Sequence, residues 1–143
     1  MIDLNLANLS IVRAAEALRT KAVSSLELTD AYLQRIAALN PELNAYISIT
    51  AERARADARR ATDELMAGES RGPLHGIPIA HKDLYETAGT RTTGGSKIHA
   101  QHVPVNDRTV TCERGCRVTR FRTTVAPSWA QAMSCTKENS MGT

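Results

Sequence analysis

Apolar residues recur every three or four positions through the first half of the chain, a spacing typical of amphipathic helices. Ser10 is a residue type that helix N-caps prefer, and it precedes a periodic stretch that ends near Lys21. A second stretch begins with Ser24 and Glu27, which have the spacing of a capping box, and Pro41 is expected to stop it. The predicted apolar faces are Ile11, Ala14, Ala15 and Leu18 in the first helix, and Leu28, Ala31, Ile36 and Leu39 in the second.

The period then changes to two over residues 44–49, which predicts a short strand. Thr50 is placed to cap a third helix that runs to about Met66, with Gly68 beyond its end. The residues on one face of the strand are Ala45, Ile47 and Ile49, and the buried stripe of the third helix is Ala54, Ala58, Ala61 and Leu65.

A short apolar run from Ile77 to Leu84 contains a charged pair, Lys82 and Asp83, and glycines or prolines bracket it on both sides. This is the pattern of a buried strand that delivers one polar residue to a site. A solvated lysine is a charged ammonium at neutral pH, whereas a desolvated lysine loses its proton more readily and can act as a base. Asp83 adds little to this interpretation, since consecutive strand residues point to opposite faces.

Two segments around Lys82 resemble the first signature block of the amidase signature family. They are Gly72-Pro-Leu-His-Gly-Ile-Pro-Ile-Ala-His-Lys-Asp-Leu84 and Thr87-Ala-Gly-Thr-Arg-Thr-Thr-Gly-Gly-Ser96. The predicted order of two helices, a strand, a long Ala-rich helix and then Gly-Ile-Pro is also similar to the start of that family's domain. The resemblance covers residues 8–110.

The resemblance implies an α/β fold in which helices are followed by strands of a mixed sheet. Family members hydrolyse amides, as bacterial amidases do, or release ammonia from glutamine, as one subunit of the glutamyl-tRNA(Gln) amidotransferase does. They use a serine nucleophile, a second serine in a cis peptide and a lysine base. The lysine of the Gly-Ile-Pro-x-x-x-Lys-Asp motif falls on Lys82, which is the catalytic residue expected here.

Both family serines lie in a Gly-Ser-rich segment further along, and these 143 residues contain nothing like it. The chain is therefore expected to be an N-terminal fragment of the family's fold, incomplete as a domain and inactive alone. Its partner would be a small-molecule amide, and no cofactor or metal is expected. The sequence leaves open which amide is cleaved, whether the protein is an amidase or an amidotransferase subunit, and its oligomeric state.

Composition supports an ordinary intracellular enzyme. The chain has 18 Lys and Arg against 15 Asp and Glu, a balance too even to indicate nucleic-acid binding. Three cysteines, an odd number, imply no disulfide framework, and neither a secretory signal nor a membrane span is visible. A cytoplasmic location and no membrane partner are therefore expected. Acidic residues interleave with Arg53, Arg55, Arg59 and Arg60, which indicates a solvated helix face.

Two other patterns offer different chemistry. Gly94-Gly95-Ser96 is similar to an anion-binding or nucleophile loop, although such turns are common. His75 and His81 flank the lysine run and are assigned no role. The alternative from another class is a small zinc or nucleic-acid binding module built on His99, His102, Cys112 and Cys116 with Arg117, Arg120 and Arg122. Its His-His-Cys-Cys order matches no common zinc finger.

Residues 111–128 depart from the family pattern, because they lose the apolar period and hold four arginines and two of the three cysteines. Family-like sequence resumes near Trp129. We therefore predict that this segment is translated out of frame between two compensating slips. Such a stretch has no selected apolar pattern, so it is expected to pack loosely.

Overall fold

The computed structural model describes residues 6–107 and the backbone of residues 119–125. The elements in order are the 3-10 helix η1 (Leu6–Asn8), the α-helices and strands α1 (Ile11–Arg19), α2 (Ser25–Leu43), β1 (Tyr46–Ser48), α3 (Ala51–Met66), β2 (Pro78–Lys82) and β3 (Thr119–Val125). The α/β class expected from the sequence is confirmed. None of the helices in this described part is both long and apolar enough to cross a bilayer.

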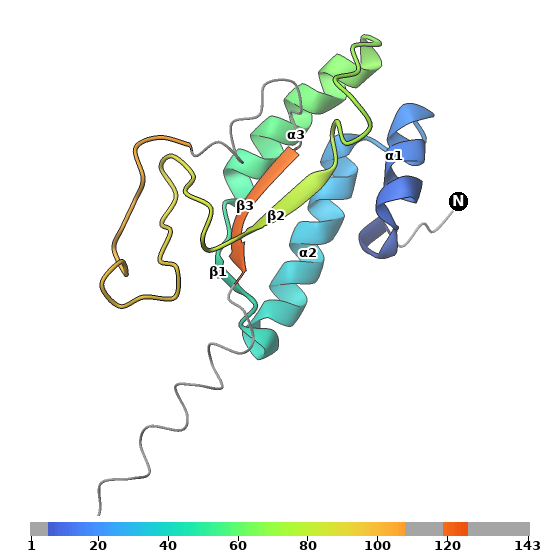
Figure 1. Ribbon diagram of the computed structural model, residues 1–143. Coiled ribbons are helices and arrows are strands. Elements are labelled where there is room, and N and C mark those ends of the chain that lie inside the picture. Colours follow the sequence, from blue (N-terminus) through green and yellow to red (C-terminus); the bar gives the residue numbers. More distant parts are fainter. Residues whose placement is uncertain (1–5, 108–118, 126–143) are drawn as a thin grey trace, which may run out of the picture.

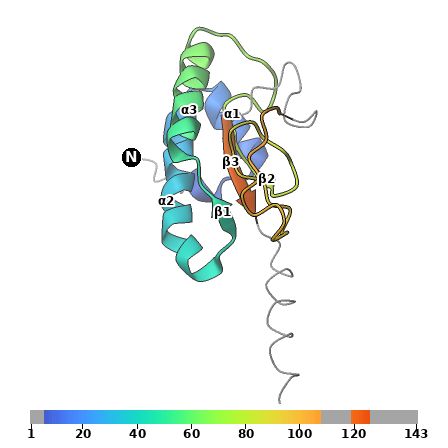
Figure 2. The same ribbon diagram turned by 90° about the vertical axis from the view of Figure 1, so that its left-hand side faces the viewer.

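The three strands form one mixed sheet in the order β1-β3-β2. β3 lies in the middle, antiparallel to β1 and parallel to β2. The three α-helices lie on one side of this sheet, and the long segment after β2 extends away on the other side (Figure 1). Turning the molecule shows the same separation, with the sheet between the helices and that segment (Figure 2).

The predicted helix starts are confirmed. Ser10 caps α1, and its Oγ accepts a hydrogen bond from the Arg13 N–H at 3.3 Å. Ser24 and Glu27 form the predicted capping box: Ser24 Oγ accepts from the Glu27 N–H at 3.1 Å, and Glu27 Oε2 accepts from the Ser24 N–H at 2.8 Å. Thr50 stands at the N-cap of α3 but makes no side-chain capping bond.

The prediction that Pro41 stops the second helix is wrong, because α2 continues through it to Leu43. Pro41 lacks the N–H that would bond to the carbonyl four residues earlier, but it lies in the last turn, where one lost bond is tolerated. The helix instead ends at Asn44, which adopts a left-handed backbone (φ +47°) and donates its N–H to the Asn40 carbonyl at 2.8 Å.

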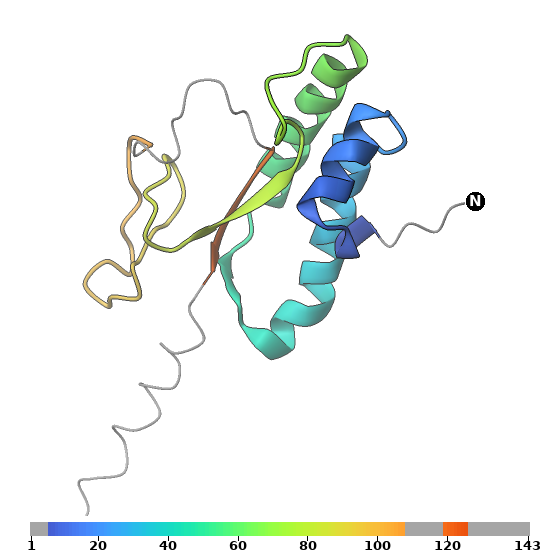
Figure 3. The same cartoon turned by 45° about the vertical axis from the view of Figure 1, so that its right-hand side comes forward.

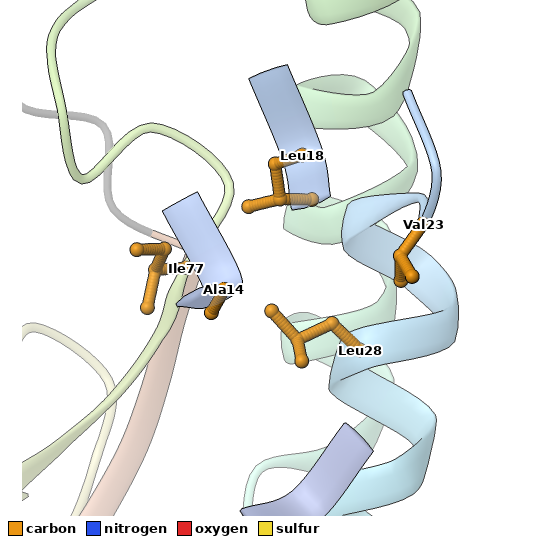
Figure 4. Packing of buried hydrophobic residues seen from close by; sticks show 5 residues of the cluster. All are labelled: Ala14, Leu18, Val23, Leu28 and Ile77. Atoms are coloured by element: carbon orange, nitrogen blue, oxygen red, sulfur yellow. The ribbon is translucent and has the colours of Figure 1, made fainter. Parts of the chain in front are cut away.

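One apolar cluster joins the helices to the start of β2. It consists of Ala14, Leu18, Val23, Leu28 and Ile77, whose side chains converge between α1, α2 and the chain entering β2 (Figure 4). Ile77 is only 6% exposed, whereas the expected core residue Ile11 is 63% exposed. Burial of Ile77 therefore sets the position at which β2 begins.

The residue before Ile77 locks the same junction. Gly76 has φ +81°, and its carbonyl accepts a hydrogen bond from the buried Ser25 hydroxyl at 2.6 Å. A Cβ on Gly76 would lie 3.1 Å from Leu65 Cδ1 and 3.2 Å from Ser25 Cβ. Both the backbone angle and the close approach of two helices thus require glycine here.

The expectation of loose packing across residues 111–128 is wrong for the backbone of Thr119–Val125. These residues form β3, the central strand, with β1 on one edge and β2 on the other. Backbone pairing on two edges does not depend on an apolar period, which is why the sequence pattern did not indicate it. The remaining residues of 111–128 lie outside the described part, and the frame slip itself stays a prediction about the DNA.

Candidate active site

Lys82 is the last residue of β2, and its side chain is exposed. The predicted place at the end of a strand is therefore confirmed, with Ile77 buried just ahead of the strand and Ile79 half-buried within it. In the parallel pairing of β2 and β3, Lys82 is opposite Val125, the last residue of β3. Ligands of α/β proteins bind outside the carboxyl ends of parallel strands, and Lys82 stands at that edge.

Asp83, the residue after Lys82, is 2% exposed. Its Oδ1 accepts a hydrogen bond from the Thr93 N–H at 2.7 Å, and its Oδ2 accepts from the Thr93 hydroxyl and from the Gly95 N–H, the latter at 3.4 Å. Its main-chain carbonyl accepts from the Gly94 N–H at 2.9 Å. A buried carboxylate requires such donors, and a single turn supplies all of them.

The Gly94-Gly95-Ser96 turn is consequently occupied by the protein's own groups. The Gly94 and Gly95 N–H groups face Asp83, and Ser96 Oγ accepts from the Ile98 N–H at 3.2 Å. This arrangement favours the structural interpretation of the turn over a catalytic one. Sequence reasoning missed the role of Asp83; the available signal was a carboxylate after an apolar strand, ten residues before a Thr-Gly-Gly turn.

Backbone hydrogen bonds fold the segment after β2 back on itself, as seen beside the sheet in Figure 3. Thr92 donates its N–H to the His102 carbonyl at 3.0 Å, and Gly89 donates to the Pro104 carbonyl at 2.9 Å. The Asp107 carboxylate accepts from the Ala88 N–H at 2.8 Å. Residues 83–107 thus form an ordered loop that returns to the carboxyl end of β2.

A second polar cluster closes the connection between α3 and β2. Arg71 donates two hydrogen bonds to the Glu64 carboxylate, at 3.0 and 2.7 Å. His75 is buried, with its Nε2 3.0 Å from Glu64 Oε2 and its Nδ1 accepting from the Arg71 N–H at 3.3 Å. Burial raises the pKa of Glu64, but the hydrogen bonds and charge of Arg71, with help from His75, outweigh it, and the net pKa is lowered. These contacts give His75 a structural role.

The zinc alternative is not assembled in the described residues. The rings of His99 and His102 lie 5.7 Å apart, centroid to centroid, and His102 Nε2 is 3.5 Å from Glu86 Oε1. Within residues 6–107 and 119–125, no three His, Cys, Asp or Glu side chains are grouped so that they could hold a metal. Cys112, Cys116 and Arg117 lie outside those ranges, and only the backbone of Arg120 and Arg122 is described.

Comparison with known proteins identifies similarity over most of the chain. The family model described as Amidase matches residues 27–136, a range that includes 111–128. One relative is the glutamyl-tRNA(Gln) amidotransferase of Granulibacter bethesdensis, whose A-type subunit is 49% identical over 106 residues. These residues cover 74% of this chain and 21% of that protein.

Solved structures show the same similarity in three dimensions. An amidase crystal structure superimposes with a TM-score of 0.71 at 32% identity, covering 82% of this chain and 26% of the other. The native peptide amidase of Stenotrophomonas maltophilia gives 0.64 at 36% identity, covering 71% of this chain and 21% of the enzyme. The chain thus spans about a fifth to a quarter of the length of the proteins it matches.

Proposed function

This chain belongs to the amidase signature family, and from that premise we propose that it supplies the lysine base of an amide-hydrolysing site, with Lys82 as that base. The observation that carries the proposal is the place of Lys82. It closes the motif Gly76-Ile-Pro-x-x-x-Lys82-Asp83 and ends β2 where the parallel strands β2 and β3 end together.

The proposed chemistry is acyl transfer. Neutral Lys82 takes a proton from the cis-peptide serine, which takes one from the serine nucleophile as that oxygen attacks the amide carbonyl. Backbone N–H groups hold the oxyanion, ammonia or an amine leaves, and water then hydrolyses the acyl-enzyme. Both serines belong to the Gly-Ser-rich segment that the 143 residues do not contain, so this chain contributes only the base.

A glutamine-derived amide is the more specific candidate substrate. The relative at 49% identity is named as a subunit of a glutamyl-tRNA(Gln) amidotransferase, whereas the peptide amidase is 36% identical. With this substrate the protein delivers ammonia from glutamine and works with further subunits in the cytoplasm. The other candidate is a free amidase that acts on a small amide.

The first test is the purified 143-residue chain, which we expect to turn over no amide. A base without its nucleophile loses most of the rate in serine hydrolases. Glutamine and simple aromatic amides are assayed for ammonia release, with Lys82→Met beside the parent. Turnover that Lys82→Met abolishes would show that the chain already holds a complete site.

The second test supplies the missing part. Residues 27–107 replace the matching segment of the Granulibacter bethesdensis relative, and ammonia release from glutamine is measured. Lys82→Met and Lys82→Arg are both expected to lower kcat by about 10²–10⁴-fold, because neither side chain can accept the proton at neutral pH. Lys97→Met, another exposed lysine in the loop after β2, is the matched control. Full activity of the Lys82 variants would disprove the base assignment.

A further inference from the structure

The side chain of Lys82 makes no hydrogen bond or ion pair with any residue in the described part of the chain. A lysine has a flexible four-carbon stem, so only its backbone fixes the direction in which it leaves the strand. A general base must nevertheless be held within hydrogen-bond reach of the proton that it abstracts. Whatever holds the end of β2 therefore affects how well Lys82 can act.

Asp83 holds that end. Side-chain oxygens and the main-chain carbonyl of this one residue accept from the Thr93 N–H, the Thr93 hydroxyl, the Gly94 N–H and the Gly95 N–H. Hydrogen bonds to an ionised acceptor are shorter and stronger than those between neutral groups. The bonds connect positions ten to twelve residues apart in the sequence.

The turn is shaped for a carboxylate. Gly94 and Gly95 have φ +59° and +71°, and successive N–H groups in turns of this kind form a concavity that binds anions. An added Cβ would meet nothing within 4 Å at Gly95, and at Gly94 its nearest neighbour would be Leu84 Cδ2 at 3.7 Å. The two glycines are therefore required for the backbone angles, which aim the N–H groups at Asp83, rather than for space.

We propose that Asp83 is a positioning residue for Lys82: its carboxylate fills the anion-binding turn at residues 93–95 and thereby fixes the carboxyl end of β2. The inference deepens the proposed function and rests on it, because positioning matters only if Lys82 is the base. Asp83 itself touches neither the substrate nor the transferred proton in this scheme.

The first measurement uses the whole 143-residue chain and follows amide hydrogen exchange by NMR. Asp83→Ala is expected to speed exchange at the Thr93 and Gly95 amides about tenfold or more and to shift the Lys82 amide resonance. Added formate is expected to reverse both effects by occupying the emptied turn. Asp83→Asn keeps the shape but only one acceptor oxygen, so it gives a smaller effect and serves if the alanine variant does not fold.

Asp107 offers the matched control, since its carboxylate also accepts a loop N–H, that of Ala88 at 2.8 Å, but it does not contact the turn at residues 93–95. Asp107→Ala is expected to speed exchange at Ala88 and to leave the Lys82 resonance in place. Unchanged exchange at Thr93 and Gly95 in both Asp83 variants would overturn the proposal. Faster exchange with an unmoved Lys82 resonance would overturn it as well.

The second measurement uses the joined enzyme described above. Asp83→Asn is expected to lower kcat about tenfold, to leave KM within about twofold and to shift the pH profile of kcat, while Asp107→Asn changes none of these. Parental kcat and pH profile in Asp83→Asn, together with loss of activity in Lys82→Met, would overturn the positioning role and leave the base in place. Activity retained by Lys82→Met would instead disprove the proposed function.

Discussion

The Thr93 N–H donates a hydrogen bond of 2.7 Å to the Asp83 carboxylate and so ties the residue beside the candidate base to a turn ten positions further along. The bond is buried at the Asp83 end and belongs to a set that also includes the Gly94 and Gly95 N–H groups. Two neighbouring residues of one motif thus have different roles: Lys82 is presented to solvent, and Asp83 anchors the strand end that presents it.

Gly76→Ala is expected to destabilise the chain more than Gly89→Ala. Both glycines have positive φ, +81° and +70°, so both variants bear the strain of a left-handed backbone, about 1–3 kcal/mol. Only the Cβ at position 76 would also approach Leu65 and Ser25, at 3.1 and 3.2 Å. The free energy of unfolding from urea titrations measures the difference, and equal losses would contradict the close packing at Gly76.

Ile77→Ala tests the junction between the helices and β2. Ile77 is 6% exposed within the main apolar cluster, so its truncation is expected to cost about 2–5 kcal/mol. Ile98→Ala removes the same atoms from a side chain that is 90% exposed, and a change within about 0.5 kcal/mol is expected. Thermal unfolding followed by circular dichroism compares the pair, and similar midpoints would mean that Ile77 does not anchor the strand.

Ser24→Ala is expected to lower the free energy of unfolding by about 1 kcal/mol, because it removes the hydroxyl that caps α2. Ser10→Ala at the start of α1 is the companion variant, since that hydroxyl makes the same kind of bond to the Arg13 N–H. Helical circular dichroism during urea unfolding reports both. No loss in either variant would show that the caps contribute little beside tertiary packing.

Glu27 predicts a pH dependence of the same capping box. The hydrogen bond from the Ser24 backbone N–H, followed by that from the Ser24 hydroxyl, lowers the pKa of Glu27 below its ordinary value of 4.5. A group whose pKa is lower in the folded state stabilises the fold above its unfolded pKa, and the stabilisation is lost as pH falls through the folded value. Glu27→Gln should therefore be less stable than the parent at pH 7, and the gap should narrow below about pH 4.5. A gap that stays constant with pH would contradict the carboxylate's role.

Glu64→Gln is expected to loosen the connection between α3 and β2. The lowered pKa of Glu64 again gives stability that is present above 4.5 and lost in acid, and the substitution removes the carboxylate that faces Arg71 and the buried His75. Glu69→Gln is the control, because Glu69 is exposed and next to the same connection. Urea midpoints at about pH 7 and about pH 3.5 separate the two, and an equal effect of both substitutions at neutral pH would contradict the cluster.

Local sequence signals determined much of this molecule. The N-caps at Ser10 and Ser24 appear where the side-chain types placed them, because a capping bond spans only three residues and needs no tertiary partner. The place of Lys82 at a strand end also followed from the sequence, since a buried strand and its polar terminus leave a short contiguous pattern. The motif around it indicated the family, which the comparisons confirmed.

Tertiary structure decided what no local pattern carries. β3 is the central strand although its segment has no apolar period, because pairing with β1 and β2 supplies its backbone hydrogen bonds. The end of α2 moved past Pro41, since a proline in a final turn forfeits only one such bond. Asp83 acquired its role only when the loop returned Thr93 and Gly95 to it, because the cost of burying a carboxylate is set by donors that are distant in the sequence.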